Sequence, residues 1–286
     1  MTAQILLLIA VITWGFTFVA TKICLSYLSP ADLLGLRMLI GVPILAVVLA
    51  LKRVQLNFKP REQLNLLLGS AIITLHFLIQ ITGLKYTSAT NTGWLISVTP
   101  LILAILSFLF LKERIGRNAI LGIIAATFGV LLLMSKGDFT RIGWLKSVGD
   151  WLVLGSAFTW AIYTAATRNI SRAKNPVAVT FAILLPTGLA LLAYMAFTSD
   201  WSRFLHMPTD VLIALLMLGI MGTALGHWFW QEGVSRLGAA RAGFYLYLEP
   251  VATTALAVPY LGEPFGIATA IGGLLVLFGV YYAQRK

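Results

Sequence analysis

A histidine and a glutamine share one face of a long apolar stretch, and both side chains can bind a small charged solute. His76, Gln80 and Gly83 lie at positions i, i+4 and i+7, so a helix over these residues places them on one side. Imidazole and carboxamide groups make directional hydrogen bonds and can hold a carboxylate or an ammonium group. In lipid such a group normally faces a wet cavity or bonds to a neighbouring helix. We expect His76 and Gln80 to line a solute pathway, with an interhelical hydrogen bond as the alternative.

Aromatic and hydroxyl side chains recur at helical spacing along several other segments. Trp14 and Thr17 lie about one turn apart, as do Trp160 and Tyr163. An indole packs against other rings and its face attracts an ammonium group, while tyrosine adds a polar hydroxyl. Core packing or lipid contact is the plainer explanation, and the pairing with hydroxyls favours a binding wall. The expected substrate-binding residues of this kind are Trp14, Thr17, Trp94, Ser97, Trp160, Tyr163, Trp230, Phe244 and Tyr247.

Two charged residues fall deep inside apolar segments. Glu249 can hold a proton in one access state and release it in another, which would couple solute movement to a proton gradient. The alternative is a buried carboxylate that its neighbours satisfy. Arg37 lies about two turns into its segment, and we expect a structural anchor that can snorkel to the outer surface.

Prolines and acidic residues mark two other corresponding segments. Pro100 and Pro250 each remove a backbone donor and clash with the carbonyl four residues earlier. We expect both to kink their helices, either as bending points or as fixed kinks. Glu113 and Glu263 lie at the ends of the same segments, where loop or capping roles are expected.

The sequence offers no set of residues for catalysis or metal binding. Its three histidines form no HExxH motif, and no GxSxG nucleophile motif is present. The single cysteine, Cys24, excludes an intrachain disulfide and a cysteine metal cluster. No phosphate-cradling GxxxxGK[ST] loop occurs, so the chain itself is not expected to hydrolyse ATP. We expect no enzyme activity, no metal and no cofactor, with an intramembrane enzyme as a remote alternative.

Composition places the chain in a membrane. Of its 286 residues 59% are hydrophobic and 11% are charged, whereas a soluble domain has roughly 25% charged residues. A membrane-spanning helix needs about 20 mostly apolar residues, and such segments recur along almost the whole chain. They are too long and too continuously apolar for barrel strands. The ten predicted spans are residues 4–21, 31–50, 62–82, 90–111, 116–134, 149–168, 176–197, 209–230, 240–260 and 266–284.

The placement of the basic residues explains the net charge of +11. With the N-terminus inside, fourteen of the 21 lysines and arginines fall on the cytoplasmic side, six on the opposite side, and Arg37 within a span. This is the positive-inside bias, so we expect both termini in the cytoplasm and no nucleic-acid partner. The first apolar stretch has no preceding basic region and no clear cleavage site, which predicts an uncleaved first helix.

One pattern occurs twice along the chain. At an offset of 150, Gly83, Gly93, Pro100, Glu113, Gly116, Gly122 and Gly129 match Gly233, Gly243, Pro250, Glu263, Gly266, Gly272 and Gly279. At an offset of 146, Trp14, Thr21 and Pro30 match Trp160, Thr167 and Pro176. We divide the chain into residues 1–135 and 136–286, with five spans each. Because five is odd, the second repeat is expected to lie inverted, as in many secondary transporters whose site lies between the repeats.

The two copies differ at the polar positions. The counterpart of His76 is Gly226, which forms a small-xxx-small face with Gly222 and allows close approach of a neighbouring helix. We expect these glycines to be structural. His227 lies beside this face, and packing is its expected role.

The repeated motifs resemble those of a known family. The first copy reads YTSATNTGWLISVTP and then LKERIG, and the second reads RLGAARAGFYLYLEP and then LGEPFG, each followed by a glycine-rich helix. Together they are similar to the EamA family of the drug/metabolite transporter superfamily, over essentially the whole chain, and most similar there to YddG-type exporters of aromatic amino acids. The resemblance implies an all-α protein with ten helices in a basket around a central cavity. It implies that the third, fourth, eighth and ninth helices line the cavity and that the first and sixth move.

The expected function is that of a secondary transporter in the inner (cytoplasmic) membrane. It would export small amphipathic metabolites, above all neutral or aromatic amino acids, by alternating access between the two repeats. The direction is implied by the resemblance. The expected partners are the substrate and the bilayer, and one chain holds both halves of a carrier, so we expect a monomer to work. The alternative cargo is a drug, a nucleotide sugar or a phosphorylated sugar; phosphates would favour two deep basic residues, and the chain offers Arg37 alone.

Overall fold

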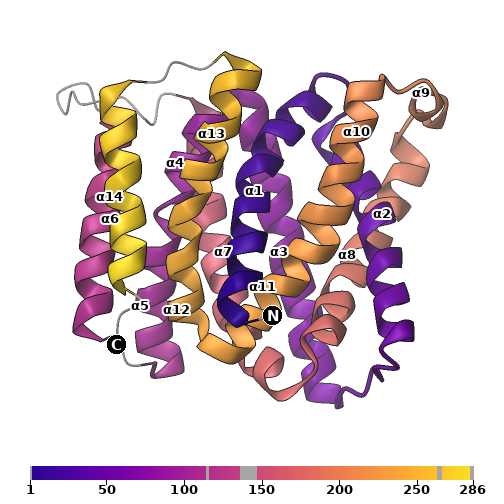
Figure 1. The fold of residues 1–286 in the computed structure, drawn as a ribbon. Coiled ribbons are helices and arrows are strands. Elements are labelled where there is room, and N and C mark those ends of the chain that lie inside the picture. The colour runs from indigo at the N-terminus through magenta and orange to yellow at the C-terminus, as the bar shows by residue number, and fades with distance from the viewer. Residues whose placement is uncertain (1, 114–115, 136–146, 263–265, 284–286) are drawn as a thin grey trace.

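The computed structural model describes residues 2–113, 116–135, 147–262 and 266–283. Within these ranges the chain folds into helices joined by short links and contains no strand, as expected for an all-α protein (Figure 1). The expected boundary between the two halves lies largely in residues 136–146, outside the described ranges, and so does Glu263.

The helices of the first half begin where capping residues and prolines predict. Ser29 caps α2, because its Oγ accepts a hydrogen bond from the Asp32 amide, and Pro30 occupies the first turn, where no amide donor is needed. The elements are α1 (Ala3–Leu25), α2 (Pro30–Leu51), α3 (Pro60–Tyr86), α4 (Ala89–Ile96), α5 (Thr99–Leu111) and α6 (Arg117–Ser135).

The second half repeats these boundaries. Ala89 and Ala239 begin α4 and α12, and Thr99 and Glu249 begin α5 and α13, at the offset of 150 that relates the two motifs. Its elements are α7 (Val148–Ala173), α8 (Pro176–Thr198), α9 (Trp201–Leu205), α10 (Thr209–Met217), the π-helical η2 (Leu218–Leu225), α11 (Gly226–Leu237), α12 (Ala239–Gly243), the 3₁₀-helical η3 (Phe244–Leu248), α13 (Glu249–Leu261) and α14 (Ile267–Ala283).

Six helical stretches in the described part of the chain are long and apolar enough to cross a membrane. They are Ala3–Leu25, Pro30–Leu51, Pro60–Tyr86, Ala89–Leu111, Pro176–Thr198 and Thr209–Leu237. Arg117–Leu132 and Ala270–Ala283 are apolar but shorter. The other predicted spans correspond to α7, which is more polar, and to the succession of α12, η3 and α13, whose members are short. A total of ten crossings therefore stays a prediction.

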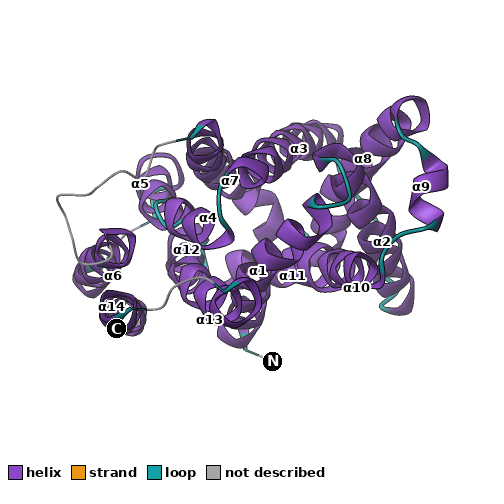
Figure 2. Ribbon diagram, turned by 90° about the horizontal axis from the view of Figure 1, so that it is seen from above, coloured by secondary structure: helices purple, strands orange, loops and turns teal. Residues whose placement is uncertain are grey.

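Corresponding helices make corresponding contacts. The helices stand side by side in Figure 1, and the view from above in Figure 2 shows α6 and α14 at one end of an elongated cluster and α2 and α8 toward the other. In the middle, α1 packs on α11 and α13, and its counterpart α7 packs on α3, α4 and α5. The pairs α2–α8 and α6–α14 each join a helix to its own counterpart.

The two central helices α1 and α7 run in opposite directions. Near the end of α1, Lys22 Nζ donates a hydrogen bond of 3.4 Å to Lys85 O, which lies near the end of α3. The same end of α3 meets the beginning of α7, because a Cβ atom on Gly83 would lie 2.8 Å from Gly149 O. The end of α1 and the start of α7 therefore lie at the same side of the molecule.

The repeated glycines let α6 and α14 pack backbone against backbone. A Cβ atom on Gly122 would lie 2.5 Å from Gly279 O, and one on Gly129 would lie 2.7 Å from Gly272 O. Each glycine of the first copy thus faces a glycine of the second copy. Such small residues allow close helix approach in a membrane, where apolar area alone does not drive association.

Candidate functional site

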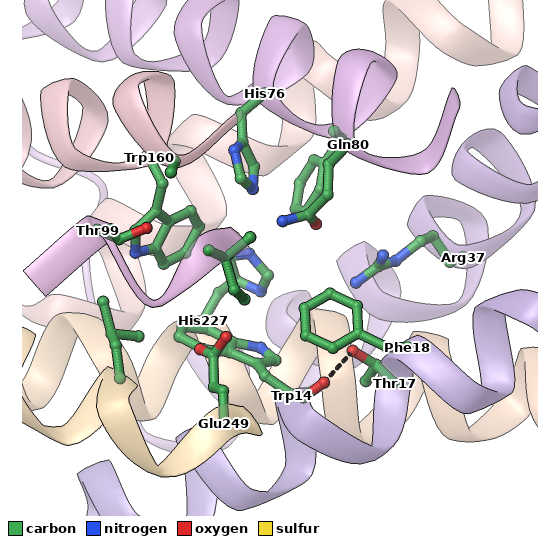
Figure 3. Close-up of a pocket in the computed structure, with 14 residues that line it drawn as sticks. Trp14, Thr17, Phe18, Arg37, His76, Gln80, Thr99, Trp160, His227 and Glu249 are labelled. Atoms are coloured by element: carbon green, nitrogen blue, oxygen red, sulfur yellow. Dashed lines mark hydrogen bonds between the residues drawn. The ribbon is translucent and has the colours of Figure 1, made fainter. Parts of the chain in front are cut away.

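A cavity lies where helices of both halves meet, and its empty space, counted with the part that is open to solvent, is about 490 Å³. Its wall takes residues from α1, α2, α3, α4, α5, α7, α11, η3 and α13, and Figure 3 shows the side chains pointing toward one another. The lining residues are Trp14, Thr17, Phe18, Arg37, His76, Phe77, Gln80, Ile96, Thr99, Ala157, Trp160, His227, Leu246 and Glu249.

Seven of the eleven predicted substrate-binding residues lie at this cavity or directly behind its wall. Trp14, Thr17, His76, Gln80 and Trp160 line it, as does Glu249, the expected proton-coupling residue. Trp230 and Tyr163 lie one layer back. The ring of Trp230 packs 5.5 Å from that of Trp14, and the ring of Tyr163 packs 5.3 Å from that of Trp160.

The other predicted residues lie in the packing around the cavity. Ser97 Oγ donates to Gly93 O within its own helix at 2.9 Å, and Trp94 is buried in the main hydrophobic core. Phe244 packs in a cluster that includes residues of α6, and Tyr247 Oη lies 2.9 Å from Thr127 Oγ1 of the same helix. The structure therefore does not bring these four side chains together with the cavity wall.

His76 joins α3 to α7 while it faces the cavity. Its Nδ1 lies 3.0 Å from Ser156 O, and because a carbonyl only accepts, Nδ1 carries the proton. In the neutral ring this leaves Nε2 as an acceptor. Gln80 Nε2 donates to Ser156 Oγ over a longer distance of 3.5 Å. His76 thus faces the cavity and also makes the interhelical hydrogen bond that was the alternative. Its role in a solute pathway stays a prediction.

The π-helical turn η2 supplies the carbonyls that hold two rings of the wall. Trp14 Nε1 donates to Gly222 O at 3.0 Å, and His227 Nδ1 lies 2.9 Å from the same oxygen and donates to it. Isolated π-helical turns leave backbone groups available and often occur at functional sites. Gly222 and Gly226 also make room for α1, since Cβ atoms there would lie 2.8 Å from Thr17 Cγ2 and 2.5 Å from Trp14 Nε1. Their expected structural role is consistent with this packing.

Aromatic rings enclose one side of the cavity. The ring centroids of Trp14 and Trp160 lie 5.0 Å apart with the planes nearly perpendicular, and His76 lies 5.0 Å from Trp160. His227 contacts both tryptophans. Within the described part of the chain, Trp160 Nε1 and His227 Nε2 are buried without a hydrogen-bond partner. One unused donor and one unused acceptor therefore lie at this wall.

Arg37 does not snorkel to the surface, so that expectation is wrong. Its side chain is buried, Nε donates to Thr223 Oγ1 at 2.8 Å, and the guanidinium lies 4.9 Å from the centroid of Phe77. The hydroxyl of Thr223 belongs to η2 and donates in turn to Leu218 O. The π-helical turn and the Phe77 ring hold the guanidinium inward, and it lines the cavity (Figure 3).

Glu249 enters the cavity from the first turn of α13. Its side chain is buried, and no described residue makes a hydrogen bond or an ion pair with its carboxyl group. The proline that follows Glu249 explains why this residue begins a new helix. The backbone is interrupted just before Pro100 and Pro250, where α4 gives way to α5 and η3 to α13. The helices are interrupted at both prolines. The expected kinks and their role as hinges stay predictions.

The cavity is lined by pairs of corresponding residues from the two halves. The offset of 146 relates Trp14 to Trp160, and the offset of 150 relates Phe77 to His227, Ile96 to Leu246 and Thr99 to Glu249. All eight side chains line the cavity. Sequence reasoning missed Phe77 and Leu246 and gave His227 a packing role. The repeat offset, applied also to the residues beside the polar face, would have paired Phe77 with His227.

At one end of the molecule, Glu113 ties three helices together away from the cavity. Its carboxylate accepts a hydrogen bond of 2.8 Å from Arg168 Nε at the end of α7. It also accepts from the backbone amides of Ala239 and Ala240 at 3.2 and 3.0 Å, at the start of α12. The expected capping role of Glu113 is confirmed.

Comparisons with known proteins agree with this architecture. The sequence model of the EamA-like transporter family matches residues 1–135 and 147–283. An uncharacterized transporter of Archaeoglobus fulgidus is 30% identical and covers 100% of both chains. The uncharacterized transporter YyaM of Bacillus subtilis is 28% identical over 94% of this chain and 89% of its own.

Two further similarities bear on substrate and fold. A probable amino-acid metabolite efflux pump of Escherichia coli is 27% identical over 97% of this chain and 93% of its own. One solved crystal structure superimposes with a TM-score of 0.78 at 21% identity, covering 99% of this chain and 98% of that one. At this identity the superposition shows the fold alone.

Proposed function

Because this chain belongs to the EamA-like transporter family, we propose that it exports small amphipathic metabolites, above all neutral and aromatic amino acids, across the cytoplasmic membrane. The observation that carries the proposal is the cavity between the two halves, which combines aromatic rings with a guanidinium, a carboxyl group, two imidazoles and an amide. An amino acid needs contacts for both charged groups and a slot for its side chain. The relative in E. coli named as a probable amino-acid metabolite efflux pump supports this choice, and a YddG-type preference for aromatic amino acids is the finer form of it.

The mechanism that we propose is alternating access between two inverted five-helix repeats, ten spans in all. Three observations support it: helix boundaries recur at the offset of 150, α1 and α7 run in opposite directions, and corresponding residues of the two halves line one cavity. Halves of similar structure offer two states of similar energy, each open to one side. Rocking of the halves about the cavity would then expose the substrate alternately, with Pro100 and Pro250 as bending points.

The end of the molecule that holds Glu113 would have to open in one of these states. There Arg168 of α7 and the amides of Ala239 and Ala240 converge on one carboxylate. Movement of α7 away from α12 would break this cluster. The proposed carrier works as a monomer, since one chain supplies the whole cavity. Both termini would lie in the cytoplasm, as the positive-inside bias predicts.

Counterflow in liposomes tests the proposed function. Purified protein is reconstituted with unlabelled phenylalanine inside, and labelled phenylalanine is added outside. A carrier gives transient accumulation of label, whereas a pore gives linear flux without exchange. Exchange of phosphorylated sugars or drugs with no exchange of any amino acid would replace this proposal by the alternative. Among the described lining residues, Arg37 is the one lysine or arginine, which disfavours dianionic phosphates.

We also propose that Glu249 couples transport to the proton gradient. Its buried carboxyl group has no partner among the described residues, so its charge state can depend on which side the cavity faces. Glu249→Gln should abolish the response of phenylalanine flux to an imposed pH gradient. An unchanged response in that variant would remove Glu249 as the coupling group and leave the exporter itself standing.

A further inference from the structure

Arg37 forms a cationic pole of the cavity that no protein group neutralises. The side chain is 5% exposed, and within the described ranges no carboxylate lies within 4.0 Å of its guanidinium. The guanidinium has five N–H donors, and the one hydrogen bond that it makes to a described residue uses Nε. The guanidinium lies 4.9 Å from the centroid of Phe77. Its outer nitrogens are directed at the cavity (Figure 3). A buried charge of this kind is costly without an anion, so the site is built for one.

Glu249 forms the opposite pole. It is 4% exposed and comes from α13, on the other side of the cavity from Arg37 in Figure 3. No described side chain or backbone amide donates a hydrogen bond to its carboxyl group, although the oxygens face the cavity. Its counterpart in the first half, Thr99, also lines the cavity but is uncharged. The second half therefore has an ionisable carboxyl group where the first half has a hydroxyl.

Because the two halves differ at the charged positions, the charged groups are distributed unequally around the cavity. The counterpart of Arg37 at the offset of 146 is Ile183, so the positive charge occurs in the first half alone. The wall also includes the aromatic side chains of Trp14, Phe18 and Trp160. A ligand with a single charge would neutralise one pole and leave the other buried without a partner. A ligand that carries both charges can satisfy both poles at once.

We propose that the cavity recognises a zwitterion, with its carboxylate at Arg37, its ammonium group at Glu249, and its side chain against the rings of Trp14 and Trp160. This inference rests on the proposed function. It adds the orientation of the substrate and the residues that bind each of its charged groups. A guanidinium binds a carboxylate through two parallel hydrogen bonds, and a carboxylate accepts from an ammonium group at short range. The indole faces add cation–π attraction near the ammonium group.

The sharpest test removes one charge from the ligand at a time. The probes are phenylalanine, phenylalaninamide, which lacks the carboxylate, and 3-phenylpropionate, which lacks the ammonium group. Competition against labelled phenylalanine in the counterflow assay ranks them. For the wild-type protein we expect each single-charge probe to compete at least about tenfold more weakly than phenylalanine, because each leaves one buried charge unpaired. Equal competition by all three probes would overturn the proposal without any mutation.

Matched variants then assign each pole. In the Arg37→Gln variant, phenylalanine should compete about tenfold more weakly than in the wild type, and no better than phenylalaninamide. Phenylalanine should still compete better than 3-phenylpropionate. In the Glu249→Gln variant, phenylalanine should compete no better than 3-phenylpropionate. Phenylalanine should still compete better than phenylalaninamide. Arg37→Lys keeps the charge and should retain part of the preference, which a loss of packing alone would not give. Arg61→Gln and Asp210→Asn remove exposed charges of the same signs. In both control variants phenylalanine should compete with the same advantage over phenylalaninamide and over 3-phenylpropionate as in the wild type.

The two proposals fail in different ways. If the wild-type protein exchanges no amino acid, the proposed function fails and this inference with it. If amino acids exchange but both variants keep the wild-type ratios, the zwitterion site is wrong and the exporter stands. If a variant does not fold, as its thermal unfolding would show, the ranking of the three probes on the wild-type protein still decides the proposal.

Discussion

His76 and Gln80 lie on the same wall of the cavity but differ in what they contribute to stability. The Nδ1–H of His76 makes a hydrogen bond of 3.0 Å to α7, whereas Gln80 has a contact of 3.5 Å with the same residue, Ser156. A net intramolecular hydrogen bond contributes about 1 kcal/mol. We infer that His76 both joins helices and faces the solute, and that Gln80 acts mainly on the solute.

Truncation of these residues should separate the two roles. Gln80→Ala should lower phenylalanine counterflow roughly tenfold and leave the unfolding temperature near wild type, because it loses a ligand contact and little packing. His76→Ala should lower the flux as well and also lower the unfolding temperature by a few degrees. Gln63→Ala, on the same helix and away from the cavity, is the control for expression and flux. Wild-type flux in Gln80→Ala would exclude Gln80 from the pathway.

At the residue scale the sequence predicts helix faces better than side-chain targets. His76, Gln80, Trp14 and Trp160 could be assigned to the cavity because polar or aromatic groups at helical spacing define a face. Arg37 could not, because its direction depends on Thr223, 186 positions away, and on the ring of Phe77. Spacing along one helix carries no information about such a partner.

The helices that build the site are interrupted at the cavity. The path from Ala89 to Leu111 breaks before Pro100, and the path from Ala239 to Leu261 breaks before Pro250. These breaks place Thr99 and Glu249 at the first turns of new helices, with Ile96 and Leu246 just before them. The prolines make both breaks predictable from the sequence.

The interruption of the 209–230 segment could not be predicted in this way. The segment divides into α10, η2 and α11, and the π-helical η2 contains no proline. Its irregular turn is matched by groups from elsewhere, since Gly222 O accepts from Trp14 and Thr223 Oγ1 accepts from Arg37. The local conformation depends on tertiary partners, and an apolar window predicts only that a helix is present.

The α6–α14 pair offers a test of the repeated glycines with a control on the same helix. Gly279→Ala should destabilise the protein by about 1–3 kcal/mol, because the new Cβ would lie 2.6 Å from Gly122 O and Ala126 N. Gly273→Ala should be neutral or slightly stabilising, since a Cβ there meets no atom within 4 Å and alanine favours the helix. Thermal unfolding in detergent measures both. Equal unfolding temperatures for the two variants would contradict the close packing of these helices.

At the scale of the whole molecule, contacts between links fix which helix ends lie together. Lys174 Nζ lies 3.1 Å from Glu62 Oε2 and donates to Asn57 O at 2.7 Å, so the α2–α3 and α7–α8 links meet at one end. Tyr27 Oη donates to Arg203 O at 3.0 Å, which joins the α1–α2 link to the segment around α9 at the other end. Charge counting alone predicted the same grouping of the links.

Labelling of single cysteines can establish how this arrangement sits in the membrane. The one native cysteine, Cys24, is buried, so Cys24→Ser gives a suitable background. In intact cells a membrane-impermeant maleimide should label Ser202→Cys, which lies in α9. It should label Asn57→Cys and Arg172→Cys only after permeabilisation, because the basic links remain in the cytoplasm. Labelling of Asn57→Cys and Arg172→Cys from opposite sides would rule out two halves inverted across the bilayer. Without that inversion the paired residues of the cavity could not open alternately to the two sides, and the alternating-access mechanism would have to be abandoned.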